Sequence, residues 1–279
     1  MKKLLFFDID GTLAYPRDIP SPETVSAIRQ ARRNGHKVFL STGRTVDSIP
    51  QAVAAIGFDG GIFSAGGIVM LEDAVLAQHF MSSETAQAVI SLLIQKSVLY
   101  TLETDDGQFN SSHAPHVLSE TNMDGVSEEM QRFTRDILFD PTTRPLSEYE
   151  GQPIFKIAYY SADPSITAQL TDGFRNIAKV VQFDNIPGLP ITIGEISDPA
   201  VNKAAAMMDV CKHFGIASSD CIAFGDSMND AEILTAAGLG VAMGNAEHSL
   251  KEIADIVCES CEENGIAKFL YKLGLAQEI

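Results

Sequence analysis

The sequence has no run of about 18 or more apolar residues, so no segment is predicted to span a bilayer as a helix. It has only four cysteines in 279 residues, too few for the disulfide framework of a small secreted protein. The apolar run that precedes Asp8 is too short for the core of a signal peptide. Together these absences predict a soluble cytoplasmic protein.

Basic residues are also scarce. The chain carries 20 Lys and Arg against 37 Asp and Glu, a formal net charge of -17. Such a chain repels phosphate backbones and anionic lipids, which argues against a general nucleic-acid or membrane-surface binder. The composition, 45% apolar and 20% charged, is that of a globular protein and argues against wholesale disorder. The oligomeric state is left open by the sequence.

Both ends of the chain alternate short apolar runs with amphipathic stretches. Strands are predicted at 3–8, 37–40, 62–64, 221–226 and 240–243. Helices are predicted at 22–34, from 44 to about 56, and at 202–214, 228–237, 246–254 and 265–273. Ser21 is placed to cap the first of these helices and Gly35 to end it. Strand–helix alternation is typical of a parallel sheet with crossover helices, so the predicted fold class is α/β.

The middle of the chain has a different pattern and is predicted to be an inserted α+β domain. Helices are predicted at 84–95, 113–120, 127–138 and 164–177, and strands at 98–104, 154–160 and 180–183. Asp105-Asp106-Gly107 is predicted to form a hairpin turn. A chain of this length favours roughly two domains. The predicted core comprises 1–81 and 192–279, and the predicted insertion is 82–191.

Two acids, Asp8 and Asp10, directly follow the first predicted strand. Ligands of open α/β sheets bind beyond the carboxyl ends of the strands, and Gly11 permits a sharp turn there. Because two adjacent carboxylates repel each other, the pair calls for a cation or a shared proton. Mg2+, completed by water and a substrate phosphate, meets that need. The alternative interpretation is a solvated turn.

A second acidic corner follows the predicted strand at 221–226. Asp226 and Asp230 are four residues apart and lie on one face of the helix that begins there. The alternative is an ordinary helix cap. Ser41-Thr42-Gly43-Arg44 forms a third corner, where a hydroxyl and a backbone N–H could hold a phosphoryl oxygen. Lys203 begins another helix, and taken alone it would be read as a solvated lysine.

Together these corners resemble the haloacid dehalogenase-like hydrolases. Asp8-Ile9-Asp10-Gly11-Thr12 is similar to the first motif of that family, and Thr42-Gly43-Arg44 to the second. Lys203 lies where the lysine of the third motif falls, and 225–230 resembles the fourth motif. The long insertion is similar to the α/β cap of the Cof-type branch, subclass IIB. Ser64-Ala65-Gly66-Gly67 departs from that branch, which usually has Asn-Gly-Ala there.

The resemblance implies a Rossmann-like core with an inserted cap that selects the substrate. It also implies residue roles. Asp8 is the nucleophile that forms an aspartyl-phosphate, and Asp10 is the general acid and base. Mg2+ is held by the Asp8 carboxylate, the Asp10 backbone carbonyl and Asp226, with Asp230 in the second coordination sphere. The residues implied to hold the phosphoryl oxygens are Thr42, Gly43, Lys203 and Asn229.

The sequence therefore predicts a Mg2+-dependent phosphatase acting on small phosphorylated metabolites, with sugar phosphates as the expected class. Two alternatives stay open: a phosphomutase, and a regulatory protein that binds a phosphorylated ligand without turnover. His113 and His116 are interpreted as exposed loop residues rather than substrate contacts. Cys258 and Cys261 are interpreted as incidental thiols, because no second cysteine pair completes a metal site.

Overall fold

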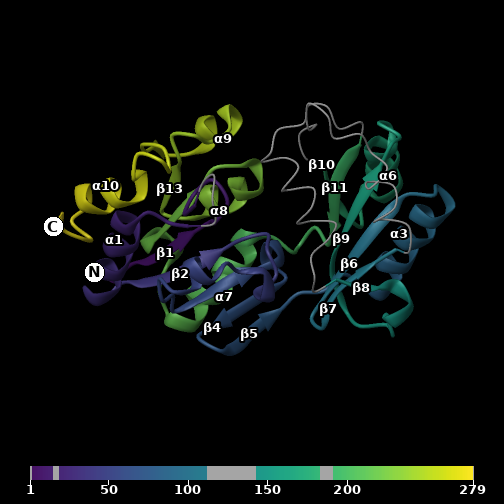
Figure 1. Ribbon diagram of the computed structural model, residues 1–279, viewed down its shortest axis with the longest axis horizontal. Coiled ribbons are helices and arrows are strands. Elements are labelled where there is room, and N and C mark those ends of the chain that lie inside the picture. Colours follow the sequence, from purple (N-terminus) through teal and green to yellow (C-terminus); the bar gives the residue numbers. More distant parts are fainter. Residues whose placement is uncertain (1, 15–18, 112–142, 183–190, 279) are drawn as a thin grey trace. The chain divides into compact units, whose positions relative to one another are not determined.

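The computed structural model describes residues 2–14, 19–111, 143–182 and 191–278 (Figure 1). The chain divides into two compact units. The first unit comprises Met1–His79 and Val201–Ile279, and the second comprises Phe80–Ala200. The boundary suggested at 191/192 differs from this division. It falls before a strand that hydrogen-bonds into the sheet of the second unit.

The first unit is built on an eight-stranded sheet. Its strands, in spatial order, are β14 (Ile256–Val257), β13 (Leu239–Ala242), β12 (Cys221–Gly225), β1 (Leu4–Phe7), β2 (Lys37–Ser41), β3 (Gly60–Phe63), β4 (Ile68–Leu71) and β5 (Ala74–Gln78). The first six run parallel, and the hairpin β4–β5 extends the sheet antiparallel. The α/β prediction is confirmed, whereas the hairpin was not predicted.

Helices connect the parallel strands. The first unit contains α1 (Pro22–Arg33), α2 (Gln51–Ala54), α7 (Lys203–Phe214), α8 (Ala231–Ala236), α9 (His248–Ile253) and α10 (Gly265–Lys272). Its 3-10 turns are η1 (Val46–Ser48), η2 (Ser64–Gly66), η4 (Ser218–Asp220) and η5 (Met228–Asp230). Helices α1 and α10 pack side by side (Figure 1). Ser21 caps α1 as predicted, because its hydroxyl accepts a hydrogen bond from Thr24 N.

The helix expected to continue to about residue 56 is instead two short pieces, η1 and α2. Pro50 stands between them, and its ring and missing N–H interrupt a helix.

The centre of the sheet is fully buried: every residue of β1 is inaccessible to solvent. Phe7 of β1 stacks on Phe224 of β12 with ring centroids 5.0 Å apart. This packing fixes the two strands that lead to the acidic corners.

The second unit is an α+β module with a six-stranded sheet. Its strands, in spatial order, are β10 (Lys179–Gln182), β11 (Thr192–Ser197), β9 (Ile154–Ser161), β6 (Leu99–Thr104), β7 (Gly107–Asn110) and β8 (Thr143–Pro145). It also contains α3 (Ser83–Gln95), α6 (Ile166–Phe174) and η3 (Leu146–Glu148). The predicted hairpin turn at Asp105-Asp106 joins β6 to β7.

The predicted helices at 113–120 and 127–138, with His113 and His116, lie outside the described residues. Among the helices that the structure describes, none has the length and apolar character needed to cross a membrane.

Candidate active site

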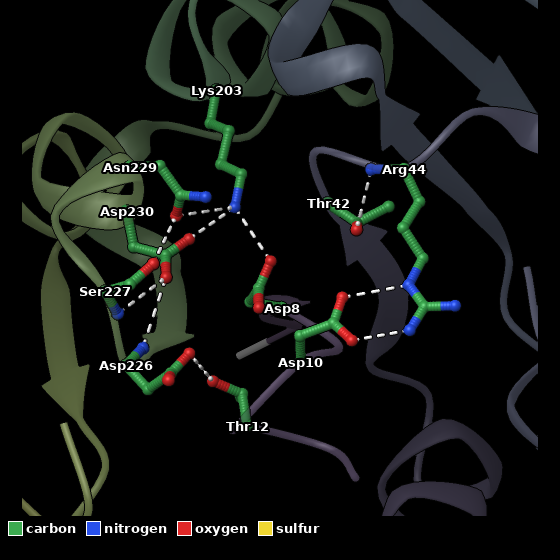
Figure 2. Close-up of polar contacts among 10 residues, drawn as sticks. All are labelled: Asp8, Asp10, Thr12, Thr42, Arg44, Lys203, Asp226, Ser227, Asn229 and Asp230. Carbon is green, nitrogen blue, oxygen red and sulfur yellow. Dashed lines mark hydrogen bonds and ion pairs between the residues drawn. The ribbon is translucent and has the colours of Figure 1, made fainter. Parts of the chain in front are cut away.

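The carboxyl ends of three neighbouring parallel strands carry the residues that the sequence singled out. Asp8 and Asp10 follow β1, Thr42 follows β2 and Asp226 follows β12. Because β1 lies between β2 and β12, the three strand ends meet at one edge of the sheet. Lys203, the first residue of α7, reaches the same place (Figure 2). The first unit thus gathers residues that are far apart in sequence.

Lys203 lies at the centre of this cluster and is completely buried. Its Nζ lies 2.8 Å from Asp8 Oδ1, 2.5 Å from Asp230 Oδ1 and 3.4 Å from Asn229 Oδ1 (Figure 2). Burial alone would lower the pKa of Lys203. The carboxylates of Asp230 and Asp8 outweigh it and hold that pKa above its usual value. Lys203 is therefore a fixed cation at neutral pH.

Asp230 has both carboxylate oxygens engaged. Oδ1 accepts from Lys203, while Oδ2 accepts from the backbone N–H of Asp226 at 3.1 Å and of Ser227 at 3.4 Å. The bond from Ser227 N belongs to the capping box that begins η5. Asp230 therefore joins the lysine to the loop that carries Asp226.

Asp8 and Asp226 are crowded by negative charge. Oxygens of Asp8, Asp226 and Asp230 lie within 4.8 Å of one another. Burial raises the pKa of Asp8 well above its usual range; Lys203 opposes this shift and the neighbouring carboxylates add to it. Burial also raises the pKa of Asp226 to about 7, helped by Asp230 and opposed by a hydrogen bond from Thr12 Oγ1 at 3.2 Å. One lysine does not neutralise three acids, so the cluster favours binding a further cation or protons.

A divalent cation fits this set of donors, because carboxylate oxygens are hard ligands of the kind that Mg2+ prefers. Asp8 uses Oδ1 for Lys203, and Asp226 uses Oδ1 for Thr12. Within the described part of the chain, nothing donates a hydrogen bond to the second oxygen of either residue. Asp230, by contrast, has both oxygens occupied. The geometry therefore favours Asp8 and Asp226 over Asp230 as metal ligands.

Asp10 forms a two-point ion pair with Arg44 (Figure 2). Arg44 Nε donates to Asp10 Oδ2 at 2.9 Å, and Nη2 donates to Oδ1 at 2.5 Å. This fork geometry fixes both the position and the plane of the carboxylate. The second sequence motif contains Arg44, but its spacing from Asp10 does not indicate this pairing. Only the adjacency of β1 and β2 brings the two side chains together.

The remaining predicted residues lie around the same edge. Thr42 is buried, and its Oγ1 accepts from Arg44 N at 3.1 Å. Among the described residues, none has an atom within 4 Å of a Cβ built on Gly43. Asn229 Oδ1 accepts from Ser227 Oγ at 2.9 Å. The sequence did not indicate a role for Thr12, although it lies inside the first motif, and it offered Ser227 only as a possible helix cap, which it is.

Almost the whole chain is similar to known proteins. The haloacid dehalogenase-like hydrolase family matches residues 5–270. A 5-amino-6-(5-phospho-D-ribitylamino)uracil phosphatase of Bacillus subtilis, YwtE, is 26% identical over 285 residues, 97% of this chain and 98% of its own. HMP-PP phosphatase of Klebsiella pneumoniae is 27% identical over 279 residues, 97% of this chain and 95% of its own. The solved structure of the subclass IIB sugar phosphatase BT4131 superposes with a TM-score of 0.78 at 22% identity, covering 98% of this chain and 100% of its own.

Proposed function

The chain belongs to the haloacid dehalogenase-like hydrolases and is a phosphatase, and from this premise we propose that it hydrolyses small phosphorylated metabolites with Mg2+ in the cytoplasm. Sugar phosphates are the expected substrate class. The observation that carries the proposal is the buried contact between Lys203 and Asp8, beside the crowded carboxylate of Asp226. A solvated turn or a simple helix cap would not bury these charges together.

The proposed reaction has two steps. A carboxylate oxygen of Asp8 attacks phosphorus and forms an aspartyl-phosphate, while the bond from phosphorus to the leaving oxygen breaks. Asp10 gives its proton to that oxygen. Water then attacks phosphorus and gives a proton to Asp10, and the bond to Asp8 breaks, which releases phosphate. The ion pair with Arg44 fixes the deprotonated carboxylate of Asp10, which is the form that accepts the proton of water in the second step.

The other residues of the cluster position and neutralise the phosphoryl group. Lys203, Asn229, Thr42 and Gly43 would contact its oxygens, since positioning and charge stabilisation dominate phosphoryl transfer. Mg2+, held by Asp8, the Asp10 backbone carbonyl and Asp226, would supply positive charge where negative charge accumulates. Asp230 would hold Lys203 and the Asp226 loop in place.

Substrate selection is proposed to belong to the second unit, acting as the cap of the catalytic first unit. Relatives of the whole chain are named for different small substrates. One is named for a ribitylaminouracil phosphate and another for HMP-PP. A site made only of phosphate-binding residues does not distinguish such leaving groups. Selectivity therefore requires residues from outside the cluster.

Phosphate release from para-nitrophenyl phosphate and from a metabolite panel, with Mg2+ and with EDTA, tests the proposal. Asp8→Asn should lower kcat by at least about a thousandfold, because it removes the nucleophile. Asp172→Asn is the matched control, since Asp172 is exposed on α6 and pairs with Arg175, three residues further along the same element. Wild-type protein without phosphate release, or full activity in Asp8→Asn, would overturn the proposal. Isomer conversion without phosphate release would identify a phosphomutase instead.

A further inference from the structure

The segment that follows β13, Met243–Glu247, is attached to the loop that carries Asp226. Met243 N donates to Gly225 O at 3.0 Å, and Glu247 N donates to Asp226 O at 2.9 Å. These two bonds tie both ends of the segment to consecutive carbonyl groups at the end of β12. The segment therefore moves with Asp226.

The same segment also reaches the loop that carries Asp8 and Asp10. Asn245 Nδ2 donates to Gly11 O at 2.8 Å, across 234 positions of sequence. Asn245 Oδ1 accepts from Cys261 N at 2.9 Å. Because both ends of the amide are engaged, its orientation is determined, and the N–H that faces Gly11 is held there.

Gly11 is the point at which the nucleophile loop touches Asp226. Its φ is +80°, and a Cβ built on it would lie 2.1 Å from Asp226 Oδ2. Thr12, the next residue, donates its hydroxyl to Asp226 Oδ1. A displacement of the Gly11 peptide would therefore change the separation between Asp226 and the two acids that precede Gly11.

Gly244, the residue before Asn245, is also held by hydrogen bonds. Gly244 N donates to Glu259 O at 3.2 Å, and Lys251 Nζ donates to Gly244 O at 2.6 Å. A Cβ on Gly244 would lie 2.6 Å from Ser260 N, so this segment packs directly on the next one. The backbone next to Asn245 is therefore held in place by hydrogen bonds and by packing.

We propose that Asn245 is a positioning residue for the phosphatase reaction, fixing the nucleophile loop against Asp226 through the Gly11 carbonyl. This inference rests on the proposed function of the same site. Asn245 touches neither the reacting atoms nor the predicted metal ligands through its side chain. It acts through the backbone of Gly11, so its removal should affect the chemical step more than substrate binding.

Two substitutions separate the contributions of the amide. Asn245→Asp keeps the acceptor for Cys261 N but removes the donor to Gly11 and adds a negative charge. Asn245→Ala removes donor and acceptor without adding charge. Asn34 is the matched control, because its Nδ2 donates to Leu275 O at 2.8 Å, also from an exposed side chain to a distant backbone carbonyl. Asn34→Asp and Asn34→Ala delete an equivalent bond away from the catalytic loop.

Both Asn245 variants should lower kcat about tenfold with KM within about threefold, because small misplacements of reacting groups cost rate rather than affinity. The Asn34 variants should keep kcat within about twofold. Hydrogen–deuterium exchange of metal-free protein gives a second measurement independent of turnover. The amides of Leu13 and Ala14, which donate to Ile9 O at 3.0 Å, should exchange faster in Asn245→Ala than in wild type.

Unchanged kcat, a rise in KM alone, unchanged exchange at Leu13 and Ala14, or equal effects in the Asn34 variants would each overturn the proposal. If Asn245→Ala does not fold, Asn245→Asp decides by the same measurements. A wild-type protein without phosphatase activity would instead refute the proposed function. In that case the exchange comparison alone decides whether Asn245 holds the loop.

Discussion

Two aspartates of the same cluster, Asp226 and Asp230, differ in their environment. Asp230 accepts hydrogen bonds on both oxygens and pairs with Lys203. Asp226 receives a single hydroxyl from Thr12, and burial raises its pKa to about 7. Hydrogen bonding favours the charged form of a carboxyl group, and burial opposes it. Asp230 is therefore suited to hold the surrounding structure in place, and Asp226 is suited to bind a cation.

The raised pKa of Asp226 predicts that metal-free protein becomes less stable as pH rises. The pKa is about 7 in the folded state against an ordinary value of 3.8. Between these values the folded state binds the extra proton, so this stabilisation is complete below about pH 4 and lost as pH rises through 7. The difference is worth about 4 kcal/mol at most. In EDTA, wild-type Tm should therefore fall between pH 5.5 and pH 8 relative to Asp226→Asn.

Asp226→Asn isolates the contribution of this carboxyl group from that of other titratable groups, such as His36, whose pKa is lowered by burial. At pH 8 in EDTA, Asp226→Asn should unfold at a higher temperature than wild type. Parallel Tm profiles for the two proteins between pH 5.5 and 8 would contradict the prediction.

At the scale of elements, the turn after β3 connects two corners of the site. Ser64 N donates to Arg44 O at 2.9 Å, and Ala65 N donates to Thr42 O at 3.0 Å. Ser64 and Ala65 both have positive φ, at 48° and 56°, which is uncommon for residues other than glycine. Such backbone strain concentrates at functional sites. The turn therefore supports the backbone on either side of Gly43 in the second motif.

Adding a single methyl group at Gly66 is expected to lower both stability and activity. Its φ is +113°, and a Cβ there would lie 2.5 Å from the carbonyl oxygen of Asn202, the residue that caps α7. Gly66→Ala should therefore shift the start of α7, where Lys203 lies, and destabilise the first unit by about 2 kcal/mol or more. Thermal unfolding should show a lower Tm, and phosphatase assays a lower kcat.

Gly173→Ala is the control for adding a methyl group to a glycine. Gly173 lies in α6 of the second unit, where a Cβ would meet no atom of the residues that the structure describes within 4 Å. Alanine should stabilise that helix by about 0.5–1 kcal/mol and leave kcat unchanged. Wild-type Tm and kcat in Gly66→Ala would show that Asn202 accommodates the methyl group without moving Lys203.

At the scale of the whole molecule, the net charge of -17 is a barrier for the proposed substrate, which is itself an anion. The acidic cluster adds to that barrier locally, because three carboxylates face one lysine. A bound divalent cation reverses the sign of such a site. The charge of the molecule thus argues against polyanionic partners but not against a small phosphate ester.

Phosphate affinity should therefore depend strongly on metal. Inorganic phosphate, titrated into wild-type protein by calorimetry, should bind at least about tenfold more tightly with Mg2+ than with EDTA, because the cation offsets the carboxylate charge. Inorganic phosphate is the proposed product, so turnover does not complicate the measurement. Mn2+ in place of Mg2+ serves as a second cation. Equal phosphate affinity with and without metal would contradict the charge argument.

Much of this protein follows from its sequence alone. Apolar runs ending in acids predict buried parallel strands, since a strand covered on both faces contains few polar residues and its carboxyl end is free for ligands. The α/β fold class predicted from this pattern is confirmed. The family that the motifs resemble, and the phosphatase activity that this resemblance implies, are confirmed as well. The roles of the individual site residues stay predictions, although the structure brings Asp8, Lys203 and Asp226 to one edge of the sheet.

Other features depend on which strands are neighbours, and no local pattern encodes that. The pairing of Arg44 with Asp10 requires β2 to lie beside β1, and the bond from Asn245 to Gly11 joins residues 234 positions apart. The assignment of β11 to the second unit rests on hydrogen bonds to β9, which propensity cannot distinguish from pairing in the first sheet. The sequence by itself determined which side chains could perform the chemistry. The tertiary structure decided which of them meet, because contacts between distant residues arise only when the chain packs.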